Sequence, residues 1–344
     1  MQQIRAPYTR EEVCAAVERR GDGKIPVFLH KFWGDGLVAK YGQALEDLAS
    51  KYPDDICDAW FMVPGNDVSP LPGSPEYRFG YKDYTNVERH SIGQTAVLLS
   101  NWDELDDFLA TFPDPYQKGT FDEVARRFAT ANGRYRLGCW WLMFHERMWS
   151  IRGMENLMMD YYDNMDGLKR IGARLVEFYK VTVDRFAALG CDGIFTSDDL
   201  GHQQGPMMSP AIFEELYLPL YRDLISYVHQ KGMHFWLHSC GDNTLLMDML
   251  IDAGVDVFHP VQKGCMDMEQ TAKRFGGRIT FLAGVDVQHL LPEGTPQQVA
   301  QEIRWMKDTF RTPGGGLLLG AGNGIMPDSP LVNIEAALNE MCAG

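Results

Sequence analysis

The sequence has little positive charge, no paired cysteines and no long apolar run. Its 32 Lys and Arg residues stand against 47 Asp and Glu residues, which gives a formal net charge of −15. Such an acidic balance disfavours nucleic acids and anionic membrane surfaces as partners, because both carry negative charge. The seven cysteines form an odd, scattered set without a CxxC pair, which is not typical of a disulfide framework.

Targeting signals and linkers are also lacking. The first residues, Met1 to Pro7, contain no apolar signal-peptide core, and no stretch approaches the roughly 18 apolar residues that span a bilayer. We therefore expect a soluble, cytoplasmic protein with reduced cysteines. Low-complexity tracts, Ser/Gly linkers and repeats of roughly 20–50 residues are absent, so we expect one domain over residues 1–344.

The chain does contain a regular alternation of apolar runs and helical patterns. Hydrophobic residues make up 45% of the sequence, which is enough for a large core. From about residue 165 onward, each short apolar run ends in a Gly, Asp, His or Asn cluster, and a helical pattern follows it. This alternation is typical of βα units around a parallel sheet. Strands are predicted over 25–30, 56–63, 135–143, 191–197, 233–238, 255–259, 279–283 and 316–320, and helices over 166–189, 209–232, 243–253, 267–275, 296–310 and 330–341.

Eight parallel strands predict a (β/α)8 barrel, the TIM barrel of the α/β class. We expect an N-terminal helical extension before the first strand. A β-hairpin-like insertion is expected around residues 66–100, where aromatic and turn-forming residues interrupt the alternation. A doubly wound sheet would also explain the alternation, but no GxGxxG motif follows the first strand, so the barrel is favoured.

The sharpest chemical signal is His238-x-Cys240, at the end of a predicted strand. Reacting groups in a barrel lie where strands end, and an imidazole and a thiolate two residues apart can hold a borderline-soft ion such as Zn²⁺. The alternative is a structural core histidine beside a buried cysteine. A catalytic zinc needs a third protein ligand, for which Cys265, His259 and Asp286 are all candidates.

Candidate catalytic residues follow other predicted strands. Asp198 and Asp199 are adjacent carboxylates that can divide acid and base roles, although one can instead cap a turn while the other is solvated. His202 fits either a site or a surface position. Asp286 fits a catalytic role as well as it fits a helix cap. The His-Glu-Arg run that begins at His145 fits an anion-binding cluster or a solvated loop.

A series of motifs runs through the C-terminal half in a fixed order. They are Asp198-Asp199, Met208-Ser-Pro-Ala-Ile-Phe213, His238-Ser-Cys-Gly-Asp-Asn, Asp252-Ala-Gly-Val-Asp256, the segment from Lys273 to Asp286, Gly294-Thr-Pro-Gln-Gln-Val299, and Gly314-Gly-Gly-Leu-Leu-Leu. In this order and spacing the chain resembles the uroporphyrinogen decarboxylase (URO-D) superfamily, in detail over about residues 165–344 and loosely elsewhere. The resemblance implies a (β/α)8 barrel, in agreement with the eight predicted strands.

The resemblance also has chemical implications. The superfamily contains a haem-pathway decarboxylase, whose pattern has arginines after the first strand, and cobalamin-dependent methyltransferases. Here the stretch after the first strand reads His30-Lys-Phe-Trp-Gly-Asp-Gly, without that carboxylate clamp. The methyltransferases hold zinc with a His-x-Cys motif and a later cysteine. His238 and Cys240 match the motif, but the segment around Asn323 holds no cysteine. Either Cys265, which we name as the third ligand, or another group completes the site, or the metal is weakly bound or absent.

We therefore predict a protein closer to the methyltransferase branch than to true uroporphyrinogen decarboxylase. It would move a methyl group between a small methylated donor such as a methyl ether or methylamine, a corrinoid supplied by a partner protein, and a thiol or other acceptor. Zinc at His238 and Cys240 would assist, and Asp198, Asp199 and Asp286 would orient the substrate. The alternatives are a metal-free decarboxylase using Asp and His chemistry, and a non-catalytic corrinoid-binding accessory protein. The family also suggests a homodimer.

Overall fold

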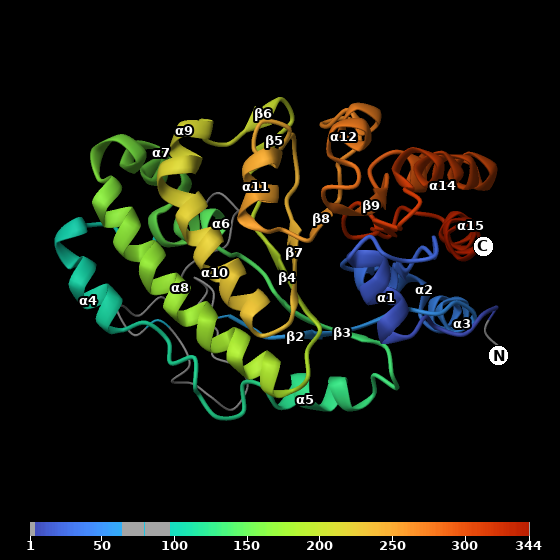
Figure 1. Ribbon diagram of the computed structural model, residues 1–344, viewed down its shortest axis with the longest axis horizontal. Helices are drawn as coiled ribbons and strands as arrows, with labels where there is room; N and C mark the ends of the chain where they lie inside the picture. Colours follow the sequence, from blue (N-terminus) through green and yellow to red (C-terminus); the bar gives the residue numbers. More distant parts are fainter. Residues whose placement is uncertain (1–3, 64–78, 80–96, 344) are drawn as a thin grey trace.

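A parallel sheet of eight strands forms the centre of the fold (Figure 1). The computed structural model describes residues 4–63, 79 and 97–343. The strands follow the spatial order β1-β10-β9-β8-β7-β4-β3-β2, and all neighbouring pairs are parallel. They are β1 (Val27–Phe28), β2 (Ile56–Trp60), β3 (Tyr135–Trp140), β4 (Gly193–Ser197), β7 (His234–His238), β8 (Val257–His259), β9 (Thr280–Val285) and β10 (Leu317–Ala321).

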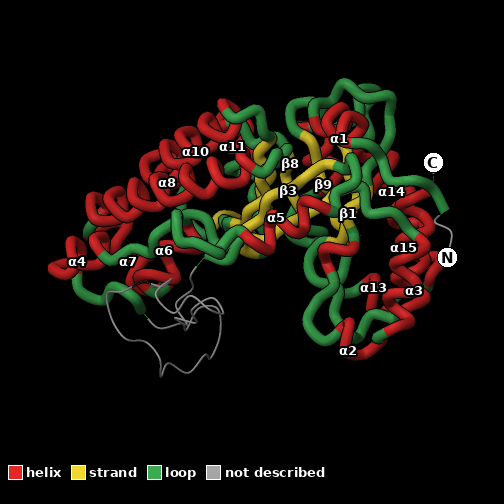
Figure 2. The backbone as a smooth tube through the Cα atoms, turned by 90° about the horizontal axis from the view of Figure 1, so that it is seen from below, coloured by secondary structure: helices red, strands yellow, loops and turns green. Residues whose placement is uncertain are grey.

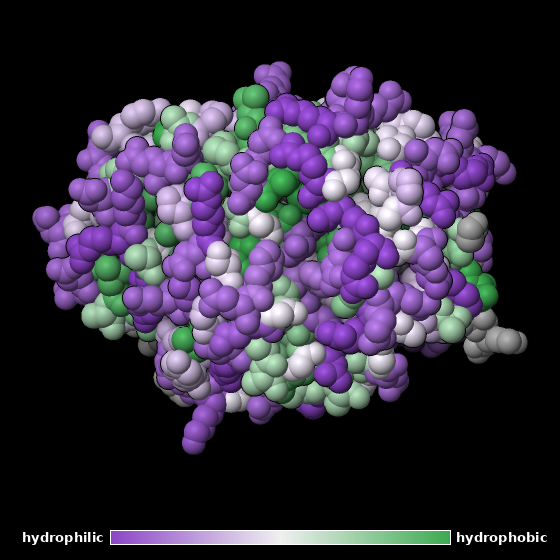
Figure 3. All heavy atoms as spheres, viewed as in Figure 1, coloured by the Kyte–Doolittle hydropathy of each residue, from purple (hydrophilic) through white to green (hydrophobic). Residues whose placement is uncertain are grey.

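Helices alternate with these strands and cover the outside of the sheet. In Figure 2, α8, α10 and α11 lie on one side of the barrel, and α14 and α15 lie on the other. Polar side chains cover most of the face seen in Figure 3. The helices are α1 (Arg10–Val17), α2 (Leu37–Tyr41), α3 (Gln43–Lys51), α4 (Leu105–Ala110), α5 (Asp122–Ala129), α6 (His145–Arg152), α7 (Met154–Asp163), α8 (Met165–Ala188), α9 (Pro210–Ile212), α10 (Leu218–Gln230), α11 (Met247–Ala253), α12 (Met268–Phe275), α13 (Leu290–Glu293), α14 (Pro296–Phe310) and α15 (Leu331–Cys342).

The predicted (β/α)8 barrel is confirmed, with all eight strands at the predicted places. The N-terminal extension is α1, which begins at Arg10 after the N-cap Thr9, and the side chains of Thr9 and Glu12 form a capping box. The hairpin predicted around residues 66–100 falls mainly outside the described residues, which include only Phe79 and 97–100 of that range. Among the helices of the described ranges, none is long and apolar enough to cross a membrane.

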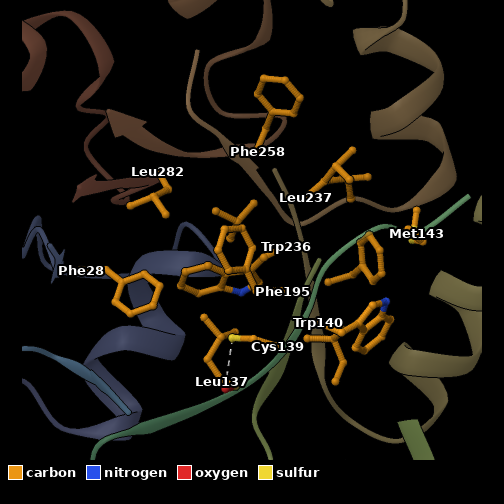
Figure 4. Close-up of a cluster of buried hydrophobic side chains, with 14 of the residues drawn as sticks. Phe28, Leu137, Cys139, Trp140, Met143, Phe195, Trp236, Leu237, Phe258 and Leu282 are labelled. Atoms are coloured by element: carbon orange, nitrogen blue, oxygen red, sulfur yellow. Dashed lines mark hydrogen bonds between the residues drawn. The ribbon is translucent and has the colours of Figure 1, made fainter. Parts of the chain in front are cut away.

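Aromatic side chains fill the interior of the sheet. Phe28 of β1 and Phe195 of β4 have ring centroids 6.4 Å apart, although their strands are not neighbours in the sheet. The sheet therefore curls around a packed core, part of which Figure 4 shows with Phe28, Phe195 and Trp236. Strands that are buried on both faces need apolar residues at nearly every position, which is why continuous apolar runs predicted them. At the carboxyl end of β8, the ring of Phe32 stacks on that of His259, with the ring centroids 5.0 Å apart.

A buried carboxylate bridges the seam between β1 and β2, the two ends of the strand order. Asp55 N donates to the Val27 carbonyl at 3.2 Å, and Val27 N donates to Asp55 Oδ2 at 2.7 Å. The same carboxylate accepts hydrogen bonds from Tyr8 N at 2.7 Å and from the Arg5 guanidinium at 2.8 and 2.7 Å. Asp55 is fully buried. One residue therefore provides here, through its backbone N–H and its carboxylate, the pairing that a strand ladder provides elsewhere.

The helix predicted over 209–232 contains a wider turn. Residues Phe213–Tyr217 form a π-helix between α9 and α10. Pro219 has no N–H, so it cannot donate the α-helical bond to the carbonyl four residues before it, and the backbone widens into a π turn instead. The side chains of Tyr217 and Tyr221 are both fully buried against the barrel. The prediction was therefore right about the helical segment and did not anticipate its internal break.

Replacing Asp55 with Ala is expected to lower the free energy of unfolding by about 3–5 kcal/mol, because a partly buried guanidinium partner and two backbone N–H groups lose their acceptor. Urea-induced unfolding measures this change. Asp248→Ala is the matched control, since Asp248 pairs with Arg274 and Arg278 at the surface and should contribute about 1 kcal/mol or less. Equal effects of the two substitutions would contradict the bridging role of Asp55.

Candidate metal centre and active site

Polar side chains meet where three neighbouring strands end. Ser197 of β4 pairs in register with His238 of β7, which pairs in register with His259 of β8. Each of the three is the last residue of its strand. In (β/α)8 barrels the carboxyl ends of the strands form the face that carries the active site. Barrel closure therefore brings residues from separate βα units onto one surface.

Three side chains present different donor atoms to one point. His238 Nε2 lies 3.3 Å from Cys240 Sγ and 3.7 Å from Asp199 Oδ1, and the three donor atoms all lie within 4.8 Å of one another. Tetrahedral zinc, with bonds of about 2.0–2.3 Å, holds its ligand atoms about 3.3–3.8 Å apart. Nitrogen, sulfur and oxygen are all ligands that zinc accepts. The spacing and the donor chemistry therefore fit a zinc ion.

The loop after β7 is held so that Cys240 faces this point. Cys240 N donates to Asp199 Oδ1 at 2.8 Å, and Asn243 Nδ2 donates to the Cys240 carbonyl at 3.0 Å. Gly241 has a φ of 81°, and a Cβ there would lie 2.2 Å from the backbone of Gly201. Only glycine allows this close approach of the two loops. The glycine after the His-x-Cys motif thus helps to position its thiol.

The electrostatic surroundings of Cys240 also bear on metal binding. Burial raises the pKa of its thiol, and the negative charge of Asp199 raises it further. Asn323 Nδ2 lies 3.5 Å from Cys240 Sγ, and the hydrogen bond that it donates lowers the pKa of the thiol in part. A thiol in this setting keeps its proton unless a cation binds beside it, because the thiolate is the form that ligates metals.

A chain of hydrogen bonds sets the tautomer of His238. His259 Nε2 lies 2.8 Å from the carbonyl oxygen of Ala321, which can only accept, so Nε2 carries the hydrogen. Burial lowers the pKa of both histidines, so each is neutral with a single N–H. His259 Nδ1 is therefore an acceptor, and His238 Nδ1, 2.7 Å away, donates to it. His238 Nε2 is left with a lone pair toward Cys240 and Asp199, as a metal ligand requires.

Glu146 adds a carboxyl group to the site. Its Oε2 accepts a hydrogen bond from Ser197 Oγ at 2.5 Å. Burial raises the pKa of Glu146 well above its ordinary value, and the charges of Asp199 and Asp198 act in the same direction, so all three favour the protonated form of Glu146. Asp198 fixes its place, because Asp198 Oδ1 accepts from Glu146 N at 2.8 Å and Oδ2 accepts from the Tyr221 hydroxyl at 2.7 Å.

Two adjoining cavities open onto these groups. The larger, of about 650 Å³, is lined by His238, Asp199 and Glu146 among others. The smaller, of about 450 Å³, is lined by Cys240 and Asp286 among others. Residues 323, 324 and 326 line both cavities. The three donor atoms therefore lie where the two cavities meet, and small molecules can approach them from either side.

Three of the predicted site residues, Asp199, His238 and Cys240, come together at this point. Asp199 was expected to be a catalytic carboxylate, and it takes the third position of the donor set. Cys265, the named third ligand, is partly exposed and does not belong to the converging group found among the described residues. His259, another candidate ligand, directs its Nδ1 at His238 and its Nε2 at a carbonyl. Both ring nitrogens are thus engaged, and His259 orients His238 instead of binding the metal.

The other predicted residues lie in different surroundings. Asp286 lines the smaller cavity, and its Oδ1 caps a turn by accepting from two backbone N–H groups at 2.8 and 3.1 Å. His202 lies in the exposed hairpin of β5 (Gly201–His202) and β6 (Gly205–Pro206). His145 is fully buried, with Nδ1 3.0 Å from the Tyr161 hydroxyl and 3.2 Å from the Tyr217 hydroxyl. It does not line either cavity.

Glu146, Lys31 and Asn323 also line the larger cavity, although Glu146 was predicted only as part of the His-Glu-Arg run and the other two were not named as site residues. Glu146 follows His145 on α6, and one residue along a helix turns a side chain by about 100°, so one neighbour faces the cavity while the other is buried behind it. Lys31 and Asn323 come just after β1 and β10. Their position at the carboxyl ends of strands was the signal that could have identified them.

The fold and the site together define a (β/α)8-barrel protein with a candidate metal centre at the carboxyl ends of its strands. The family pattern described as uroporphyrinogen decarboxylase (URO-D) matches residues 145–342, more than half of the sequence. The chain belongs to this family.

Two methyltransferases are similar to the chain. A methylated-thiol–coenzyme M methyltransferase from Methanosarcina mazei is 26% identical over 150 residues, which are 44% of this chain and 37% of that protein. The match thus spans little more than a third of that relative's length. The structure of a methyltransferase from Methanosarcina mazei has a TM-score of 0.65 at 16% identity, covers 97% of this chain and 98% of its own, and shows the same fold. The predicted resemblance to the methyltransferase side of the superfamily is confirmed.

Substituting His259 with Phe is expected to weaken zinc binding by about 10- to 100-fold, because His238 Nδ1 loses the acceptor that fixes its tautomer and ring orientation. Competition with a chromophoric chelator measures the affinity, and circular dichroism checks the fold. His229→Ala, which removes a surface histidine paired with Asp256, is the control and should leave the affinity unchanged. An unchanged zinc affinity in His259→Phe would show that the hydrogen bond between His259 and His238 does not determine the metal-binding tautomer of His238.

Proposed function

We propose that this protein is a methyltransferase that moves a methyl group between a small methylated donor, a corrinoid carried by a partner protein, and a thiol or other acceptor. The observation that carries the proposal is the convergence of His238 Nε2, Cys240 Sγ and Asp199 Oδ1 at the junction of two cavities. Membership of the URO-D family and similarity to two methyltransferases support it.

The donor set suits a catalytic rather than a structural zinc site. Three protein ligands leave a fourth position for a small molecule, whereas structural zinc sites are closed by four. Zinc bound here would lower the pKa of a thiol substrate or polarise the atom that bears the methyl group. The chain's own contribution is to hold Cys240 by its loop, to keep the Nε2 lone pair of His238 exposed, and to orient Asp199 through the Cys240 N–H.

Glu146 would handle the proton of the reaction. When a methyl group leaves a thioether or an ether, the bond between carbon and sulfur or oxygen breaks, the methyl group passes to the corrinoid, and the leaving atom keeps the electron pair. That atom then takes a proton, which Glu146 would donate, since its surroundings favour its protonated form. In the opposite direction the thiol loses its proton as the sulfur–carbon bond forms. Asp198 would keep Glu146 in place, and Asp286 would contact ligands in the smaller cavity.

Decarboxylation of a carboxylated substrate is the second candidate function. It is favoured by the raised pKa of Glu146 in the larger cavity, because loss of carbon dioxide leaves an electron pair on carbon that must accept a proton. The reaction needs no metal. It differs from methyl transfer in that Cys240 would have no part in it.

Methyl transfer is expected to depend on the donor set. His238→Ala and Cys240→Ser should each remove stoichiometric zinc and lower methyl transfer from a donor panel to a corrinoid protein by about 100-fold or more. Elemental analysis and corrinoid absorbance measure the two effects. Carbon dioxide release that persists in Cys240→Ser would favour the decarboxylase. Corrinoid binding without turnover across the panel would identify an accessory protein.

Glu146→Gln should keep the hydrogen bond from Ser197 but remove the transferable proton. We expect kcat to fall by about 10²–10⁴-fold while zinc binding stays within about twofold, because general acid catalysis is lost and the metal ligands are unchanged. Glu215→Gln, at a surface ion pair with Lys169, is the matched control and should retain activity. An active Glu146→Gln enzyme would exclude the proposed proton transfer.

A further inference from the structure

The buried carboxylate of Asp198 connects the end of β4 with two helices. Its Oδ1 accepts a hydrogen bond from Glu146 N at 2.8 Å, and its Oδ2 accepts one from the Tyr221 hydroxyl at 2.7 Å. Glu146 is the second residue of α6, and Tyr221 lies near the start of α10. The N–H groups in the first turn of a helix have no acceptor within the helix, so Asp198 supplies the one that Glu146 N needs. Asp198 and Tyr221 are both fully buried.

The two hydrogen bonds also fix the plane of the Asp198 carboxylate. The last torsion of an aspartate side chain has a broad energy minimum, so a carboxylate bound through one oxygen can still turn. Here each oxygen has its own donor, one from α6 and one from α10. Burial raises the pKa of Asp198 to about 6, and the bonds from Glu146 N and from the Tyr221 hydroxyl act against that rise, so both stabilise the charged carboxylate.

The π turn between α9 and α10 determines the direction in which Tyr221 points. A π turn holds one residue more than an α-helical turn, so side chains beyond it face another direction than in an unbroken α-helix. The Tyr221 ring packs on Phe144, the N-cap residue of α6, with ring centroids 5.5 Å apart, and on Phe213 at 5.6 Å. Tyr217, within the π turn, has its hydroxyl 3.2 Å from Nδ1 of His145, the first residue of α6. Both tyrosines therefore contact the start of the helix that carries Glu146.

We propose that Tyr221 is a positioning residue that acts on Glu146 through Asp198. Its hydroxyl fixes the Asp198 carboxylate, the carboxylate fixes the N–H of Glu146, and the start of α6 then holds the Glu146 side chain at the larger cavity. Tyr221 lines neither of the two cavities, so its effect on the reaction passes through Asp198. This inference rests on the proposed function, in which Glu146 donates the proton.

Tyr221→Phe tests the inference, because it removes the hydroxyl and keeps the ring. We expect kcat for methyl transfer to fall about 10-fold, the scale of one hydrogen bond to a charged group, while KM and zinc content stay within about twofold. In a Glu146→Gln background the same substitution should lower the remaining rate by less than about twofold, because residues that act as a unit are not additive. Equal fold-losses in the two backgrounds would show a general structural effect and overturn the inference.

Amide hydrogen exchange provides a measurement that does not depend on activity. In Tyr221→Phe the Glu146 N–H should exchange about 10-fold faster, because its acceptor is no longer fixed. Tyr227→Phe is the matched control, since Tyr227 also lies on α10 and donates to the two carboxylate oxygens of Asp184, on α8, at 2.9 Å each. It should match the wild type in kcat and in the exchange of Glu146 N–H. Unchanged exchange in Tyr221→Phe would overturn the inference.

The combined results separate this inference from the proposed function. If Tyr221→Phe lowers kcat only where Glu146 is present, both proposals stand. If the wild type transfers methyl groups but Tyr221→Phe lowers the rate equally with and without Glu146, the proposed function stands and the inference is overturned. If the wild type transfers no methyl group but the Glu146 N–H exchanges faster in Tyr221→Phe alone, the positioning of Glu146 stands and the methyltransferase proposal fails.

Discussion

The hydrogen bond between the Nδ1 atoms of His238 and His259 is the interaction on which the site depends. It determines which nitrogen of His238 faces the cavities, and it does so only because the Ala321 carbonyl holds the other end of His259. Those three residues end β7, β8 and β10. The tautomer of one side chain is thus a consequence of barrel closure, since a sheet with another strand order would not bring the third strand end to His259.

The cavity separates groups that would otherwise neutralise one another. Burial and neighbouring negative charge raise the pKa of Glu146, Asp199 is turned toward Cys240, and Lys31 is surrounded by aromatic rings. A salt bridge between Lys31 and either carboxyl group would remove a proton donor or a metal ligand. The Lys31 ammonium group instead lies over the rings of Trp60, Trp141 and Phe32, 4.6, 4.8 and 4.9 Å from their centroids.

Much of the fold could be predicted from the sequence, whereas only part of the site could. The strands are buried on both faces, so their apolar runs stand out, and His238 and Cys240 are adjacent in the chain, so their partnership is visible as a motif. The choice of Asp199 over Cys265 depends on a backbone N–H in another loop, and the choice of Glu146 over His145 depends on the rotation of α6. Neither leaves a local pattern in the sequence.

The π turn at Phe213–Tyr217 has a further consequence for how this chain can vary. A π turn accommodates one residue more than an α-helical turn, so the parts before and after it are out of phase by one position. Loss of a single residue would change that phase and rotate Tyr217 or Tyr221 out of the interior. Evolution along this stretch is therefore constrained in length more strictly than in composition.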